Sequence, residues 1–195
     1  LQQYRQVEPY FQEAYSLHPT IPHGILEAIA FTYSRFCHLT PLEDNPPSNC
    51  MPATYGVMGL TLDGRGYFKD NLHLVAALSG ISEADIIHSP RSNILAYAAA
   101  FAQLQQQFNI HSNNFAELIP ILEKLSELPD NQSNKSFDFA RKSNLYAFCQ
   151  FLNNDSFREK MHISMPLVPM ERCFGDMLPL LQSPSVQIIG NAVIS

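Results

Sequence analysis

The sequence predicts a mostly α-helical fold with a loop-rich cleft and a short, irregular C-terminal extension. Apolar residues recur at helical spacing through most of the chain, and the clearest such stripe lies between Pro22 and Phe36. A run of small residues over Ala96–Ala102, broken by two aromatic ones, suits close packing of one helix on another. Proline and glycine concentrate between these patterns, where they mark loops and turns. We therefore predict one helical domain over residues 1–160 and an extension or linker over residues 161–195.

The first two helices are predicted from their apolar faces and from the prolines that bound them. A helix over Tyr4–Leu17 stops before His18-Pro19, because proline disfavours helix in the residue that precedes it. A second helix runs over Pro22–Phe36, with Pro22 in its first turn, where the missing N–H costs nothing. The buried stripe of this second helix is formed by Ile25, Leu26, Ile29, Ala30 and Tyr33.

Two loop-forming segments follow the second helix. Cys37–Ala53 contains four prolines beside asparagine and aspartate, which favours a loop. Long loops without structure of their own are usually functional or tied down. Tyr55–Gly66 is punctuated by four glycines, at positions 56, 59, 64 and 66. Since glycine permits close backbone approach, this segment is interpreted either as an ordinary turn or as part of a binding site.

Further helices are predicted downstream from their apolar faces and their start signals. Serine or asparagine precedes several of these patterns, as is typical of N-terminal caps. Pro120 lies inside one pattern and predicts a kink. The predicted spans are Tyr67–Leu78, a short helix capped by Ser82 with Asp85, Ser89–Phe108, a helix from Asn113 or Asn114 to Leu128, and Phe137–Leu152.

The chain changes character after Asp155. Prolines at positions 166, 169 and 184 interrupt any long helix, and Val186–Ile189 has the composition of a short strand. No internal repeat is present in the sequence. The segment beyond Leu181 is interpreted as a connector toward a further domain.

Composition and charge argue against several classes of function. The chain has 195 residues, of which 46% are apolar and 15% charged, and its formal net charge is -6. An acidic surface argues against a nucleic-acid partner, because phosphate binding needs a basic footprint. No apolar run approaches the ~20 residues of a membrane span. The chain begins at Leu1 with neither an initiator methionine nor a signal peptide, which favours a mature or trimmed form.

The sequence carries no motif for metal or cofactor chemistry. The four cysteines lack Cys-x-x-Cys spacing and the seven histidines lack a His-Glu-x-x-His pattern, so we predict no metal site and no cofactor. A Gly-x-Ser-x-Gly elbow and the glycine patterns of nucleotide-binding loops are also absent. Cys37 and Cys50 flank one loop, and two interpretations stay open: a disulfide in an oxidising compartment, or two free thiols.

Three sequence segments occur in an order that is found in a known superfamily. They are AIAFTYSRF at Ala28–Phe36, YGVMGLT at Tyr55–Thr61 and NILAYAAAFAQL at Asn93–Leu104. Over roughly Pro22–Phe108 the chain resembles the lysozyme-like superfamily, in its branch of soluble lytic transglycosylases and goose-type lysozymes. In that family a helix ends in Glu-Ser, a Gly-x-Met-Gly-Leu-Met-Gln turn follows, and a later helix packs behind the cleft. The resemblance implies a lysozyme-like helical domain.

The chain departs from the family at the position that carries its chemistry. Ser34 corresponds to the family's serine, but Tyr33 stands where the family has its catalytic glutamate, and Leu62 replaces the glutamine of the turn. Cleavage of a glycosidic bond needs a carboxylic acid that protonates the leaving oxygen. A phenol with an ordinary pKa of about 10 is a poor proton donor at neutral pH. The expected catalytic residue is therefore missing.

Displaced carboxylates are the alternative source of an acid. Asp63 lies beside the glycine turn and Glu43 lies in the preceding loop, so both are candidates. Glu27 is six residues before Tyr33 and is expected on a different side of the helix. For each carboxylate the competing interpretation is a solvated surface charge. Asp63 is also followed by glycine, which is typical of a turn closed by the aspartate side chain.

A glycan-binding cleft needs no catalytic acid. Tyrosine combines an apolar face with a polar tip, which a sugar ring can use. The competing interpretation of the tyrosine that ends the second helix is a core residue whose hydroxyl has found a partner. The positions that the resemblance implies for glycan contact are Tyr33, Ser34, Tyr55, Gly56, Met58, Gly59 and Leu60.

Three functional hypotheses follow. The first is a peptidoglycan-binding, catalytically degenerate transglycosylase-like domain, similar to the N-terminal region of bacterial N-acetylmuramoyl-L-alanine amidases. It implies glycan strands as partner, a fused C-terminal amidase domain, and a periplasmic, cell-envelope or secreted location. The second is a glycan-cleaving enzyme that uses a displaced carboxylate, and the third is a structural spacer with a filled cleft. An open groove beside Tyr33 distinguishes the first two from the third, and a carboxylate pointing into that groove distinguishes the second from the first.

Overall fold

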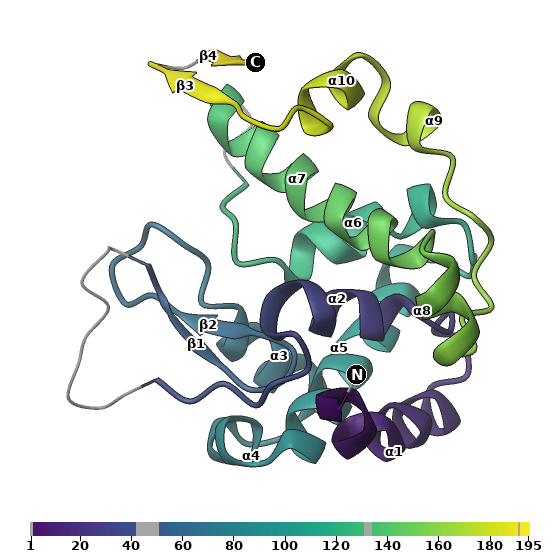
Figure 1. The fold of residues 1–195 in the computed structure, drawn as a ribbon. Helices are drawn as coiled ribbons and strands as arrows, with labels where there is room; N and C mark the ends of the chain where they lie inside the picture. Colours follow the sequence, from purple (N-terminus) through teal and green to yellow (C-terminus); the bar gives the residue numbers. More distant parts are fainter. Residues whose placement is uncertain (1, 42–50, 131–133, 191) are drawn as a thin grey trace.

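The computed structural model describes residues 2–41, 51–130, 134–190 and 192–195, and helices dominate them (Figure 1). The prediction of a mostly α-helical fold is confirmed. The helices are α1 (Gln2–Leu17), α2 (Ile25–Ser34), α3 (Asn71–Ser79), α4 (Glu83–His88), α5 (Pro90–Phe108), α6 (Phe115–Leu125), α7 (Lys135–Leu152), α8 (Asp155–Lys160), α9 (Met170–Phe174) and α10 (Leu178–Leu181), with a 3-10 turn at Gly175–Met177. The strands are β1 (Ala53–Tyr55), β2 (Leu60–Leu62), β3 (Gln187–Ile189) and β4 (Ala192–Ile194).

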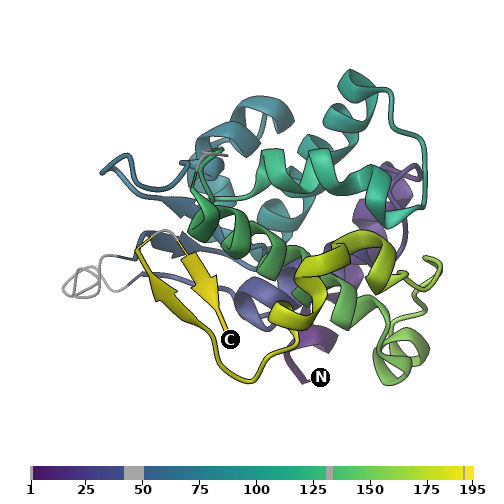
Figure 2. The same ribbon diagram turned by 90° about the horizontal axis from the view of Figure 1, so that it is seen from above.

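Helix α2 crosses the middle of the fold between two groups of helices (Figure 1). On one side α5 packs against α1, α3 and α4, and on the other side α7 packs against α2. The antiparallel hairpin of β1 and β2 lies at the C-terminal end of α2, with Tyr55 opposite Leu60 in its register. The second hairpin, β3 and β4, lies beside α7 (Figure 2).

The buried apolar residues form a core that is centred on α2. Ile25, Leu26, Ile29 and Ala30 of this helix are completely buried. Each large apolar side chain that is removed from water in this way contributes about 1.5–3 kcal/mol. The predicted stripe of the second helix is therefore the core face of α2.

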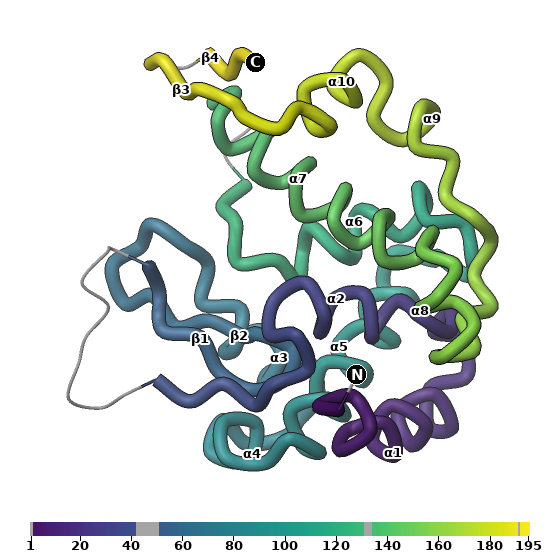
Figure 3. The backbone as a smooth tube through the Cα atoms, viewed as in Figure 1, coloured from purple at the N-terminus to yellow at the C-terminus, as the bar shows by residue number. Residues whose placement is uncertain are grey.

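The segment predicted as an extension also contributes to this core. From α8 to α10 the backbone runs back along α7 (Figure 3). Six residues of this segment are buried in the same apolar cluster as α2, so the core continues across the predicted boundary between residues 160 and 161. They are Met161, Ile163, Met165, Val168, Phe174 and Leu178.

Several predicted helix starts are confirmed by their capping hydrogen bonds. The Ser82 hydroxyl accepts a hydrogen bond from the backbone N–H of Asp85 at 3.1 Å, and Ser89 and Asn114 cap α5 and α6 in the same way. Such caps satisfy N–H groups that have no partner within the helix. Pro120 lies inside α6, as predicted.

Other boundaries differ from the prediction because backbone turns take precedence over the apolar pattern. Helix α2 begins at Ile25 and not near Pro22, because Gly24 adopts a left-handed conformation before it. A side chain at Gly24 would also meet Ile163 at 2.6 Å. Helix α3 begins at Asn71 and not at Tyr67, because the preceding backbone is held in a turn. The β1–β2 hairpin was not predicted, since three-residue strands give almost no alternating pattern.

Two further observations concern membrane-spanning helices and the possible disulfide. Within the described ranges, each helix is too short or too polar to cross a lipid bilayer. Cys50 lies outside the described residues, so the predicted alternatives for Cys37 and Cys50 stay predictions.

Glu27 is a carboxylate buried in the core, 3% exposed. The hydroxyl of Tyr15, in α1, donates a hydrogen bond to Oε2 of Glu27 at 2.5 Å and accepts one from the N–H of Gly24 at 2.9 Å. Burial raises the pKa of Glu27 to about 7, although the hydrogen bond from Tyr15 acts in the opposite direction. Glu27 therefore faces α1 and not the side of α2 that carries Tyr33.

The free energy of unfolding should fall as the pH rises from about 4.5 to about 7. The folded protein keeps a proton on Glu27 up to about pH 7, whereas the unfolded chain releases it near the ordinary value of 4.5. The unfolded state then binds fewer protons, so rising pH favours unfolding by about 2–3 kcal/mol over this window. Urea unfolding at several pH values measures this change.

The control for this prediction is Glu27→Gln, which removes the titrating group and keeps a hydrogen-bonding partner for Tyr15. The unfolding free energy of this variant should depend less on pH over the same window. Identical pH profiles for the two proteins would contradict the raised pKa of Glu27.

Candidate functional site

The C-terminal end of α2 is docked on the turn that joins β1 and β2. Tyr33 and Ser34 are its last two residues. The Ser34 hydroxyl donates a hydrogen bond to the carbonyl oxygen of Val57 at 2.6 Å. Gly59 has a positive φ of 64°, and a Cβ atom built on it would lie 2.4 Å from Cβ of Tyr33. The backbone of the turn approaches α2 so closely that only glycine fits at position 59.

Asn93, in α5, holds the same turn from the other side. Its Oδ1 atom accepts a hydrogen bond from the N–H of Met58 at 2.8 Å, and its Nδ2 atom donates one to the carbonyl of Ile86 at 3.1 Å. A Cβ atom on Gly56 would meet the Asn93 amide at 2.0 Å. The three sequence segments that carry the resemblance therefore meet at this one place.

Most positions predicted to contact a glycan are buried. Tyr33 and Tyr55 are half-buried, so these two side chains present surface to the solvent. The role of all seven residues in glycan binding stays a prediction, but five of them are packed inside the protein in this structure. The five buried residues are Ser34, Gly56, Met58, Gly59 and Leu60.

The side chain of Tyr33 is fixed by α7. Its hydroxyl accepts a hydrogen bond from Nδ2 of Asn144 at 3.1 Å, and its ring lies edge-on to Phe148, with 5.9 Å between the ring centroids. Burial, together with the charge of Glu127 and a hydrogen bond to it, raises the pKa of Tyr33 well above its ordinary value. The phenol is thus an even weaker acid here than in solution.

Glu127 is a carboxylate beside Tyr33 that the sequence analysis did not identify. It is half-buried and follows the end of α6. Its charge raises the pKa values of both Tyr33 and Tyr97, after the larger effect of burial. No local pattern connects Glu127 with α2, because the fold alone brings these distant segments together.

The hollow beside Tyr33 is small. Its volume is about 10 Å³, which is about the space that one water molecule needs. A sugar ring therefore does not fit there in this conformation. The residues that line this hollow are Tyr33, Leu122, Glu123, Ser126, Arg141, Asn144, Leu145 and Phe148.

The carboxylate of Asp63 closes the turn that follows β2. It accepts hydrogen bonds from the N–H groups of Arg65, Tyr67 and Phe68, at 3.3, 2.8 and 3.2 Å. Partial desolvation alone would raise the pKa of Asp63, but these three hydrogen bonds outweigh it and the pKa is lowered. Such an ionised, turn-closing carboxylate is poorly suited to donate a proton. The other candidate acid, Glu43, lies outside the described residues.

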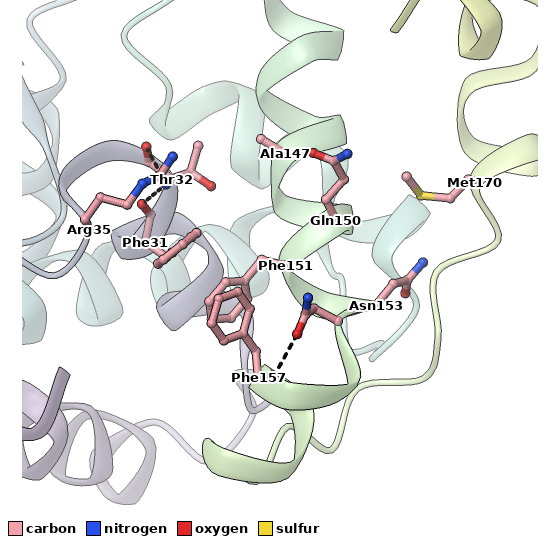
Figure 4. Close-up of a pocket in the computed structure, with 10 residues that line it drawn as sticks. Phe31, Thr32, Arg35, Ala147, Gln150, Phe151, Asn153, Phe157 and Met170 are labelled. Carbon is pink, nitrogen blue, oxygen red and sulfur yellow. Dashed lines mark hydrogen bonds between the residues drawn. The ribbon is translucent and has the colours of Figure 1, made fainter. Parts of the chain in front are cut away.

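A larger pocket of about 560 Å³ lies on the other side of α2, between α2, α7, α8 and α9 (Figure 4). Phenyl rings form its base and polar side chains surround them. The sequence analysis did not predict this pocket, because its residues come from segments without a common motif. The residues that line it are Phe31, Thr32, Arg35, Ala147, Gln150, Phe151, Asn153, Asn154, Phe157 and Met170.

Neither a metal site nor comparison with known proteins assigns a function to the chain. Among the described residues, no group of three or more histidine, cysteine, aspartate or glutamate side chains is placed to hold a metal ion. Comparison of the chain with protein-family models, with curated proteins and with solved structures finds no match in any of the three. The assignment to the lysozyme-like superfamily therefore stays a prediction from the three segments.

Gly59→Ala should destabilise the protein more than Gly64→Ala does. Both glycines have positive φ, which costs an alanine about 1–2 kcal/mol. A Cβ atom on Gly64 meets nothing within 4 Å, whereas one on Gly59 clashes with Tyr33. Overpacking adds about 1–3 kcal/mol to the strain at Gly59. Chemical denaturation of both variants measures the difference, and equal losses would show that α2 and the turn are not tightly docked.

Asp63→Ala should lower the unfolding midpoint and leave any binding to insoluble peptidoglycan nearly unchanged. The substitution removes the acceptor of three backbone N–H groups but no group that faces Tyr33. Thermal unfolding and a sedimentation assay with purified peptidoglycan measure the two effects. A large loss of binding in a folded Asp63→Ala protein would instead place Asp63 in the functional site.

Proposed function

We propose that this chain is a peptidoglycan-binding, catalytically degenerate transglycosylase-like domain with a lysozyme-like fold. One observation carries the proposal. The helix end that docks on the Gly56–Gly59 turn bears the phenol of Tyr33 and no carboxylic acid. The meeting of α2, this turn and Asn93 of α5 supports the resemblance, because the family's three segments also surround its cleft.

The environment of Tyr33 supports a loss of catalysis. A glycosidase needs a group that donates a proton near neutral pH, and the raised pKa of Tyr33 excludes that role for its hydroxyl. The hydroxyl is also engaged by Asn144. The hollow of about 10 Å³ beside it leaves no room for a sugar at the position of the missing acid.

Members of the family bind peptidoglycan and cleave it. Without a proton donor at position 33, binding is the activity that this chain can keep. The net charge of -6 is compatible with the uncharged sugar backbone of peptidoglycan. We further propose that the domain belongs to a bacterial cell-wall hydrolase, an N-acetylmuramoyl-L-alanine amidase above all, and acts in the periplasm, in the cell envelope or outside the cell. Its task there would be to hold a fused catalytic domain on its substrate.

Glycan cleavage by a displaced acid is the second candidate function, and Glu127 is the observation that favours it. This carboxylate lies beside Tyr33, at the helix end where the resemblance expects an acid. Asp63 is less suited, since its carboxylate is occupied by the turn. Because the hollow beside Tyr33 holds only about 10 Å³, cleavage there would require the surrounding side chains to move.

The purified chain should sediment with insoluble peptidoglycan and release no muropeptides from it. Loss of a general acid lowers the rate of such a reaction by about 10²–10⁴-fold. Mass spectrometry of the soluble fraction measures release, and the protein left in the supernatant measures binding.

The competing hypotheses predict different results in the same assay. Release of muropeptides that is abolished by Glu127→Gln, but retained by Glu159→Gln on the exposed face of α8, would establish the displaced-acid enzyme. Absence of both binding and release would favour the structural spacer.

A further inference from the structure

The base of the 560 Å³ pocket is a cluster of three phenylalanine rings (Figure 4). The centroid of Phe31 lies 5.2 Å from that of Phe151 and 5.0 Å from that of Phe157, and Phe151 and Phe157 stack at 4.6 Å. Phe31 and Phe157 are only half-buried, so their rings contribute accessible apolar surface. Pockets that bind small ligands have volumes of about 300–1,000 Å³ and combine such surface with a few polar groups.

Arg35 supplies a cation at the edge of these rings. Its guanidinium carbon lies 4.2 Å from the centroid of Phe31, which holds the charge over the ring. Its Nη1 atom donates hydrogen bonds to the carbonyl oxygen of Phe31 and, at 3.5 Å, to that of Thr32. The side chain is therefore fixed through one nitrogen, while Nε and Nη2 remain as donors.

The charge of Arg35 is not neutralised within the described part of the chain. The ion pairs found there join other residues, and none of the described residues that line the pocket is acidic. An exposed, fixed cation beside an apolar surface suits a ligand that has both a negative charge and an apolar part. Arginine recognises a planar carboxylate especially well, through two parallel hydrogen bonds.

The remaining rim of the pocket adds amides. Asn153 is held by two hydrogen bonds to Val168, at 2.9 and 2.8 Å, and Asn154 caps α8. Gln150 is exposed on α7, and no described group bonds to its side chain. A free amide donates and accepts hydrogen bonds, so it complements a peptide backbone.

We propose that this pocket binds a carboxylate-bearing stem peptide of peptidoglycan, an inference that rests on the proposed function. The carboxylate bonds to Arg35, the apolar part of the peptide lies on Phe31 and Phe157, and Gln150 bonds to a peptide amide. The chain then recognises the peptide portion of the polymer on the side of α2 that faces away from Tyr33.

Calorimetric titration of the purified chain with a soluble muramyl peptide that ends in a free carboxylate tests this assignment. Arg35→Gln should weaken binding by about 10- to 100-fold, because it removes a hydrogen bond between charged groups. Ala147→Leu should also weaken binding, since it fills the pocket and keeps the charge.

The matched control is Arg65→Gln, which removes another exposed cation, from the turn after β2. The same muramyl peptide with its carboxylate amidated should bind the unmodified chain as weakly as the free acid binds Arg35→Gln.

The possible results separate the pocket from the proposed function. Peptidoglycan sedimentation without muramyl-peptide binding would overturn the pocket assignment and leave the proposed function in place. Equal binding by the unmodified chain and Arg35→Gln, both folded by circular dichroism, would overturn the assignment as well. Muramyl-peptide binding that is lost in Arg35→Gln and Ala147→Leu would support the pocket, even if no binding to the insoluble polymer were found.

Discussion

The close contact between the end of α2 and the turn of the β1–β2 hairpin is the constraint on which the candidate site depends. Gly59 allows the turn to lie against Tyr33, and Ser34 bonds to the carbonyl of Val57. Asn93 fixes the other face of the same turn. Because this turn has contacts on both faces, the position of the α2 terminus relative to the hairpin and α5 has little freedom. The backbone at position 33 is therefore held in one place relative to the turn.

Because of this constraint, the residue type at position 33 decides which proton-transfer chemistry the site could support. A carboxylic acid in the apolar surroundings of Tyr33 would have a raised pKa and would serve as a proton donor. A phenol in the same surroundings also has a raised pKa, but this makes it inert at neutral pH. The ring fills space as well, since it packs against Phe148 and bonds to Asn144. The same burial would suit a carboxylic acid to proton donation, whereas it leaves the phenol with a packing role only.

The two sides of α2 near its C-terminus differ in the free volume that is open to a ligand. On the Tyr33 side the hollow is about 10 Å³, and on the Arg35 side the pocket is about 560 Å³. Both sides are closed by the same helix, α7, which contributes Asn144 to one and Gln150 to the other. Helix α7 therefore covers the side chain of Tyr33 and also forms a wall of the pocket. A ligand in this pocket would lie on the side of α2 that faces away from Tyr33.

The sequence by itself determined the helical class, the helix starts that are marked by a capping side chain, and the turn-closing geometry of Asp63, because these follow from local spacing and capping. The hypothesis that Tyr33 replaces a catalytic acid also came from the sequence, and it stays a prediction. Only the tertiary structure decided which residues share an environment: Glu127 beside Tyr33, Glu27 beside Tyr15, and Phe31, whose ring carries Arg35, beside the phenyl rings of α7 and α8. These contacts join segments that are distant in sequence, and such pairs leave no periodic pattern. Burial was likewise decided by the fold, since the turn that was expected to line a cleft is packed between α2 and α5.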